Sequence, residues 1–167
     1  MKIIQTERLI IKPLLESDKP DMLELLYDSE IKKTYMIPEF ESVEAAERLF
    51  YAFMRLSNSS ERFVGGIYFE GKLIGFLNDT EISEKTIEMG YVISPEYKNR
   101  GFCTEAFGGV INYLFVNGFD EVVCGAFEEN IASIRVMQKC NMKLRDKTDE
   151  IEYRGKTHRC IYYSITK

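Results

Sequence analysis

The residues best suited to ligand binding or chemistry form a short loop at positions 98–104. They are Lys98, Asn99, Arg100, Gly101, Phe102, Cys103 and Thr104, and a helix is predicted to begin within them. A helix N-terminus has unpaired backbone N–H groups and about half a unit of positive charge, and glycine lets a ligand approach closely. This combination suits an anion such as a phosphate. The alternative, in which Gly101 only makes a tight turn in a solvated loop, stays open.

Two standard nucleotide-binding motifs do not fit this loop. A P-loop requires G-x-x-x-x-G-K-S/T, and a dinucleotide site requires G-x-G-x-x-G after the first strand of a βαβ unit; the chain has neither pattern here. An anion site at residues 98–104 therefore needs a different structural context.

The elements around this loop belong to a longer series of predicted strands and helices. Strand-like runs occur at 6–12, 62–69, 72–78, 86–94, 121–127, 142–147 and 159–166. Helices are predicted to begin within 17–20 and 41–45, to span 102–116, and to run from an Asn130 cap to near Cys140. Glu70 and Gly71 are suited to a hairpin turn. Three strands follow one another without helices, so we expect a mixed sheet with helices on both faces rather than a doubly wound fold.

The composition limits the classes of protein to consider. The chain has 167 residues, 45% of them hydrophobic, so it can bury a core, and we predict a single domain over 1–167. Its 22 basic and 27 acidic residues give a net charge of −5. This charge disfavours direct binding to nucleic acid, because phosphate contacts need a basic face, and it fits a cationic substrate slightly better.

The cysteines and the N-terminus bear on metal binding and location. The four cysteines stand singly and the sequence has one histidine, so no zinc pattern is present and we expect no metal. Isolated thiols favour a reducing, cytoplasmic setting. The first residues lack the pattern of a signal peptide, and no window approaches the roughly 20 apolar residues of a membrane span. We therefore expect a cytoplasmic protein without a membrane partner.

Three stretches resemble one known family, the GNAT N-acetyltransferases. Residues 88–104 resemble its strand and cofactor loop, whose pattern Q/R-x-x-G-x-G/A maps onto Lys98, Gly101 and Cys103, with lysine and cysteine as departures. Residues 6–11 (TERLII) resemble the start of the branch that contains ribosomal-protein N-terminal acetyltransferases, and residues 130–133 (NIAS) resemble the N-x-x-S helix. The resemblance covers nearly the whole chain. It implies an α/β (α+β) GNAT fold with a mixed, largely antiparallel sheet of about seven strands between helices.

The resemblance implies acetyl-CoA as co-substrate. The main chain of Tyr91, Val92 and Ile93 would then follow the pantetheine arm, and residues 98–104 would hold the pyrophosphate. One strand N–H could stabilise the negative charge that develops on the thioester oxygen. Asn130 is expected to cap its helix and to orient the cofactor. A plain core strand at residues 91–93 is an alternative that is compatible with this role.

The resemblance also implies how protons move. An alkyl ammonium has a pKa near 10, so the acceptor amine needs a base, and Glu88 is the candidate. It shares a strand face with Gly90 and Val92; the alternative is an ordinary surface glutamate. The family's usual tyrosine acid falls at Met137, which cannot donate a proton. Ser133 remains a candidate for the acid or for a contact to the pantetheine. The alternative is a first-turn serine that only hydrogen-bonds within its own helix.

These observations predict an acetyl-CoA-dependent N-acetyltransferase that acts directly on a primary amine. The acceptor could be a protein N-terminus or a small amine such as a polyamine or aminoglycoside, and the acidic residues of segment 35–47 favour a cation. The alternative is a non-catalytic module that binds or senses acyl-CoA. Whether the protein forms a homodimer stays open. We do not predict an acyl-cysteine at Cys103, although a helix N-terminus can lower a thiol pKa.

Overall fold

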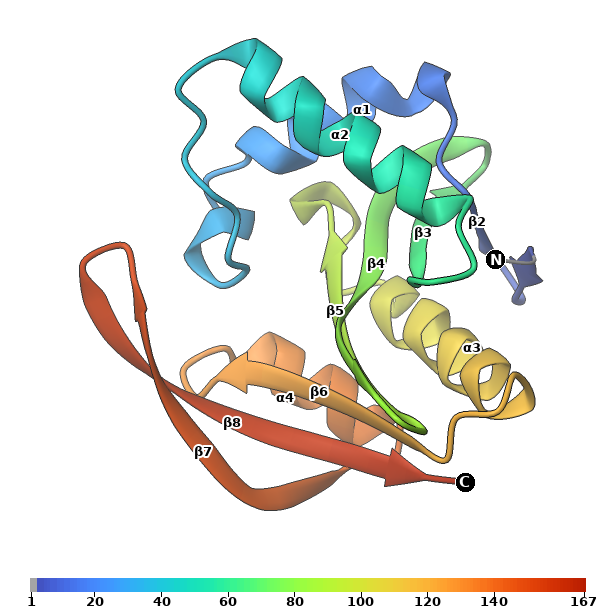
Figure 1. Ribbon diagram of the computed structural model, residues 1–167, viewed down its shortest axis with the longest axis vertical. Helices are drawn as coiled ribbons and strands as arrows, with labels where there is room; N and C mark the ends of the chain where they lie inside the picture. Colours follow the sequence, from blue (N-terminus) through green and yellow to red (C-terminus); the bar gives the residue numbers. More distant parts are fainter. Residues whose placement is uncertain (1–2) are drawn as a thin grey trace.

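The structure, a computed structural model, describes residues 3–167 and has one eight-stranded sheet at its centre (Figure 1). The strands are β1 (Ile4–Gln5), β2 (Ile10–Lys12), β3 (Val64–Phe69), β4 (Lys72–Ser83), β5 (Thr86–Ile93), β6 (Glu121–Phe127), β7 (Lys143–Tyr153) and β8 (Lys156–Thr166). They lie in the order β1-β2-β3-β4-β5-β6-β8-β7. Every neighbouring pair is antiparallel except β5 and β6. The predicted mixed, largely antiparallel sheet is confirmed.

Helices cover both faces of this sheet, as predicted (Figure 1). Within residues 3–167 they are α1 (Lys19–Tyr27), α2 (Val43–Ser57), α3 (Phe102–Val116) and α4 (Ile131–Lys139), with 3₁₀ turns at Glu16–Asp18, Ile31–Lys33 and Pro95–Tyr97. On one face, α1 and α2 pack against Phe76 and Val92. On the other, α3 and α4 pack around Met89. None of the helices in the described chain is long and apolar enough to cross a membrane.

The predicted strand at residues 6–12 is wrong in its first half, because residues 6–9 form a turn between β1 and β2. In this turn the N–H of Thr6 donates to the carbonyl of Leu9 at 3.0 Å. The Thr6 hydroxyl and the Arg8 N–H both donate to the carboxylate of Glu105, at 2.6 and 2.7 Å. Glu105 lies on α3, so a partner far along the chain holds the turn.

The same contact braces the loop that precedes α3. The Arg8 guanidinium pairs with Glu105 at 2.7 Å and donates to the carbonyl of Arg100 at 3.0 Å. Arg100 immediately precedes Gly101, so the N-terminal turn holds the start of α3 from outside.

The parallel pair β5–β6 is short and then opens. It begins with Thr86 opposite Glu121 and ends with Glu88 opposite Val123. The other edge of β5 stays paired with β4 as far as Ile93. Beyond Glu88, β5 therefore has an unpaired main-chain edge toward β6, and Figure 1 shows the two strands diverging there. Backbone polar groups need partners, so this fork is suited to a ligand that can pair with a strand.

Candidate active site

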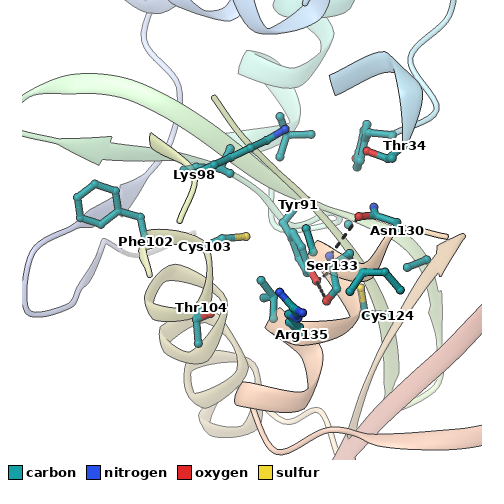
Figure 2. Close-up of a pocket in the computed structure, with 18 of the residues that line it drawn as sticks. Thr34, Tyr91, Lys98, Phe102, Cys103, Thr104, Cys124, Asn130, Ser133 and Arg135 are labelled. Carbon is teal, nitrogen blue, oxygen red and sulfur yellow. Dashed lines mark hydrogen bonds between the residues drawn. The ribbon is translucent and has the colours of Figure 1, made fainter. Parts of the chain in front are cut away.

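The fork opens into a first cavity of about 420 Å³ (Figure 2). Its walls come from β5, the loop after it, the start of α3, the end of β6 and the first turns of α4. The predicted site residues that line it are Tyr91, Val92, Ile93, Lys98, Asn99, Gly101, Phe102, Cys103, Thr104, Asn130 and Ser133. The fold thus brings together every predicted cofactor-binding residue except Arg100, while their role toward a cofactor stays a prediction.

The loop before α3 has the backbone shape of an anion site. Gly101 is the N-cap of α3 with φ of 79°, in the left-handed region that favours glycine. No side chain caps the helix there. The first-turn N–H groups have no partner within the helix, so they remain available on the cavity side.

The wall of the first cavity is basic although the protein has a net charge of −5. Lys98 comes from the loop, and Arg135 and Lys139 come from α4. Among the described residues that line this cavity there is no Asp or Glu. Arg135 and Lys139 were not predicted, but their spacing of four residues on a helix was a usable signal, because it puts both on one face. The cavity therefore suits a ligand with several negative charges.

Polar side chains tie β5 to α4 inside the first cavity (Figure 2). The side-chain oxygen of Asn130 accepts from the Ser133 N–H at 3.2 Å, which confirms the predicted cap. The Tyr91 hydroxyl lies 2.8 Å from Oγ of Ser133. Burial raises the pKa of Tyr91 well above its usual value, so the phenol keeps its proton. The Tyr91 hydroxyl can also donate to the carbonyl of Ser133 at 3.1 Å, and between Tyr91 and Oγ of Ser133 either hydroxyl can be the donor.

Two residues of the predicted pyrophosphate loop have side chains that make other contacts. The Arg100 guanidinium lies over the rings of Phe102 and Phe69, 4.8 and 5.3 Å from their centroids, and does not line the cavity. The Phe102 side chain is buried in the core, and Figure 2 shows its ring directed away from the labelled polar residues. These two positions contribute their main chain to the loop while their side chains stabilise it.

The two thiols that line the first cavity are not nucleophiles. Burial, with a smaller contribution from nearby Cys140, raises the pKa of Cys103 to about 12. Burial also raises the pKa of Cys124. Because the thiolate is the reactive form, these groups are unreactive at neutral pH. Burial outweighs the effect of the helix N-terminus on Cys103.

A second cavity, of about 300 Å³, adjoins the first and contains Glu88. Its walls are mainly aromatic and aliphatic, with side chains from Leu26, Tyr35, Met36, Ile37, Leu49, Phe53, Phe76, Phe127, Ile151 and Tyr162. Among the described lining residues, Glu88 is the only one with a charge. Its Oε1 accepts from the hydroxyl of Thr80 at 3.0 Å. Thr80 lies at the irregularity of β4 between Asp79 and Glu81, so the bulge supplies this contact.

Two glycines separate the cavities. Gly90 and Gly125 each lie two residues beyond the last pair between β5 and β6, and both line both cavities. A Cβ on Gly90 would come within 3.0 Å of the Tyr35 hydroxyl, and one on Gly125 within 2.8 Å of the Tyr162 ring. Neither glycine was predicted as part of the site. Their small size lets Tyr35 and Tyr162 pack against the two strands where the cavities adjoin.

A long hairpin helps to close the second cavity. The hydroxyl of Tyr153, at the end of β7, is within hydrogen-bond distance of three carbonyls, those of Lys32 (2.8 Å), Tyr35 (3.1 Å) and Ile37 (3.3 Å). The segment 31–37 therefore lies against the hairpin of β7 and β8, and both contribute to the wall of the cavity.

A basic cavity thus adjoins a mostly apolar cavity with one carboxylate, an arrangement suited to two ligands. The sequence matches the model of the acetyltransferase (GNAT) domain over residues 8–143. The chain therefore belongs to the GNAT acetyltransferase family, and the predicted resemblance is confirmed.

Relatives with similar sequences are N-acetyltransferases by name. The uncharacterized N-acetyltransferase YnaD of Bacillus subtilis (strain 168) is 31% identical over 142 residues, which is 84% of this chain and 82% of YnaD. YoaA of the same organism, also an uncharacterized N-acetyltransferase, is 26% identical over 171 residues, or 99% of this chain and 97% of YoaA. The protein is thus an acetyltransferase.

The fold is also that of solved acetyltransferases. RimL, a ribosomal L7/L12 α-N-protein acetyltransferase in complex with coenzyme A, matches with a TM-score of 0.87 and 17% identity over 99% of this chain and 98% of RimL. RimL is a member of the branch that the TERL stretch predicted. At this identity the comparison shows the shared fold.

Proposed function

We propose that the protein transfers the acetyl group of acetyl-CoA directly to a primary amine. The observation that carries this proposal is the meeting of two cavities of opposite charge at Gly90 and Gly125. The first has three cations and, among its described lining residues, no carboxylate, which suits the phosphates of CoA. The second has one carboxylate and no described basic residue, which suits an ammonium group.

The residues of the first cavity fit acetyl-CoA, which would supply an activated acetyl thioester. The free edge of β5 beyond Glu88 can pair with the amide groups of the pantetheine arm. The first-turn N–H groups of α3, together with Lys98, Arg135 and Lys139, can bind the phosphates. Because the main chain makes the central contacts, the lysine and cysteine departures from the family pattern are compatible with this role.

Glu88 would remove the proton from the amine. It lies at the vertex of the fork, its Oε1 is held by Thr80, and it has no ion pair among the described residues. A carboxylate without a cationic partner is free to accept a proton from an incoming ammonium, directly or through water.

Ser133 would position the cofactor and share a proton with the departing thiolate. Tyr91 holds its Oγ at 2.8 Å and Asn130 fixes its backbone. A thiol has a pKa of about 8.5, so this step needs little help. Met137, at the family's usual tyrosine position, is fully buried in the core, so that position supplies no acid.

Two measurements on the purified protein test the proposal. Calorimetry should show that acetyl-CoA binds, and a thiol assay should show CoA release that depends on an added primary amine. Acetyl-CoA binding without release by any amine would leave a binding module, which no comparison favours. Failure to bind acetyl-CoA would overturn the proposal altogether.

A further inference from the structure

We infer that the acceptor is a primary amine with a single positive charge and a bulky apolar group close to the nitrogen. This inference rests on the proposed function, because it concerns the second substrate of that reaction. It follows from the walls of the second cavity, from the state of its polar groups and from the position of the nearby acidic residues.

The second cavity offers mostly apolar surface in a small volume. At about 300 Å³ it is at the lower end of ligand pockets. The rings of Tyr35 and Phe53 both pack edge-to-face on Phe76, with centroids 5.7 and 5.5 Å away. A wall of this kind is stabilised when an apolar group replaces water, at about 25 cal/mol for each Å² covered. An aromatic or branched aliphatic substituent makes the most of this surface.

Three polar side chains of this cavity, Tyr35, Asn78 and Thr80, already have hydrogen-bond partners. The Tyr35 hydroxyl donates to the side-chain oxygen of Asn78 at 2.5 Å, and the Asn78 amide donates to the carbonyl of Asp79 at 3.0 Å. Thr80 donates to Oε1 of Glu88. The other oxygen of Glu88 has no hydrogen-bond partner among the described residues, so the one charged group among the described lining residues can pair with an ammonium group.

The acidic residues of segment 35–47 do not add further negative charge to this cavity, which corrects the basis for expecting that they select a cation. Glu39 pairs with Arg154 and, at 3.1 Å, with Lys32. Glu47 pairs with Lys19 at 3.1 Å. The residues of the segment that do line the cavity are 35–38, none of them charged.

These features disfavour two other kinds of acceptor. A polyamine or an aminoglycoside would place its further ammonium groups against apolar surface, where a charge without a partner is costly. A free amino acid would bring a carboxylate, for which the described lining residues supply no cation. A monoamine, or the N-terminus of a peptide whose first side chain is apolar, has neither disadvantage.

A panel of amines in the CoA-release assay tests the inference. Phenethylamine should have a kcat/KM at least about tenfold above those of spermidine and kanamycin, in the range that apolar contacts in a pocket provide. The peptide amides Phe-Ala-NH2 and Ser-Ala-NH2 extend the panel to peptide N-termini, with an apolar and a polar first side chain. If Phe-Ala-NH2 exceeds phenethylamine, the acceptor is a peptide N-terminus; if phenethylamine is better, it is a small amine. Spermidine as the equal or better substrate would overturn the inference.

A charge placed in the wall gives an independent test. Met36 lines the second cavity and is 55% exposed, so substitution there should leave the fold intact. Met36→Glu adds a second carboxylate and should raise the ratio of spermidine to phenethylamine activity at least about fivefold. Met36→Gln has a similar size without the charge and should not raise it. An unchanged ratio in Met36→Glu would place the acceptor elsewhere.

The two proposals fail in different ways. If spermidine is the better substrate, the acetyltransferase reaction stands and only the inference is wrong. If none of the amines releases CoA, the proposed function is wrong and the inference falls with it.

Discussion

The two cavities are built in different ways. The first depends on main-chain groups of one strand and one helix start, with α4 adding two cations and a capped first turn. The second depends on side chains from α1, α2, the segment after α1, and strands β4 to β8. A ligand that is the same in every member of a family can be held by a local motif. A ligand that differs between members is selected by side chains from many parts of the chain.

The largest expected effect is a loss of turnover from a substitution in the second cavity that leaves acetyl-CoA binding to the first unchanged. Glu88→Gln keeps the size and hydrogen bonding of the side chain but removes its basicity. Turnover should fall by about 10²–10⁴-fold, the range for loss of a general base. The dissociation constant for acetyl-CoA should stay unchanged in calorimetry, because Glu88 does not line the first cavity.

The pH dependence of this variant identifies the role of Glu88. Raising the pH should restore part of the rate, because more of the acceptor amine then arrives without its proton. A variant that loses only affinity for the amine would show that Glu88 binds the cation. Wild-type kinetics would show that it is a surface residue.

The next effect should appear only in the first cavity. Gly101→Asp places a negative charge where the phosphates are expected and should weaken acetyl-CoA binding at least tenfold, or about 1.4 kcal/mol. Gly101→Asn is the matched control, because asparagine has nearly the same shape and tolerates the left-handed backbone at this position. Equal affinities for the two variants would assign the effect to the backbone rather than to charge.

A smaller effect is expected from the brace outside the first cavity. Glu105→Gln weakens the contacts that hold Arg8 and, through it, the carbonyl of Arg100. The KM for acetyl-CoA should rise about threefold to tenfold, as expected for one charged hydrogen bond near the surface. The KM for the amine should not change. A change confined to the amine would show that the two cavities are coupled through α3.

The carboxylate of Glu105 should also make the free energy of unfolding depend on pH. Burial acts to raise the pKa of Glu105, but hydrogen bonds from Thr6 and Arg8 outweigh it and hold the pKa below its usual value. The stabilisation is therefore present above the unfolded pKa of about 4.3 and is lost as pH falls through the lower folded value. In urea unfolding, the difference in stability between wild type and Glu105→Gln should be largest near pH 7 and should shrink below pH 4. A constant difference would show that the charge contributes nothing.

The smallest effect is expected at the polar tie between β5 and α4. Ser133→Ala should lower turnover by less than about tenfold and raise the KM for acetyl-CoA, since one neutral hydrogen bond contributes about 1 kcal/mol. Tyr91→Phe should act similarly, because it releases the Ser133 hydroxyl. A loss beyond about a hundredfold in Ser133→Ala alone would make this serine the general acid.

Local signals predicted the elements and most of the loop residues of the first cavity, but not Arg135, Lys139 or the two glycines. Helix α3 and strand β6 have the predicted bounds, because their ends are marked by Gly101 and by a glycine after the helix. The turn at Glu70 and Gly71 has φ of 50° and 84°, as a tight hairpin requires. Asn130 caps its helix and Asn141 takes φ of 61° after it. Each of these features depends on residues that are neighbours in the sequence.

The other features of the fold and the second cavity depend on contacts between residues far apart in the sequence. Strands were predicted at 142–147 and 159–166, yet β7 and β8 are 11 residues each. The run RDKTDE in β7 has no alternation of apolar and polar residues, so no local signal marks it as a strand. Its last three residues pair with β8, and the first three fall in the irregularity between Leu144 and Thr148. The turn after Thr6 similarly depends on Glu105. The second cavity combines eight elements, and no pattern in the sequence shows which of their side chains meet.

The hydroxyl of Tyr153 gives the second cavity an adjustable wall. It has one proton and three carbonyl oxygens between 2.8 and 3.3 Å, so it can donate to only one of them at a time. The segment 31–37 can therefore shift by exchanging one hydrogen bond for another, without losing its attachment to the hairpin. This exchange would allow acceptors of different widths to enter while the segment stays attached to the hairpin. Selection for a new acceptor could thus act on this segment and leave acetyl-CoA binding intact.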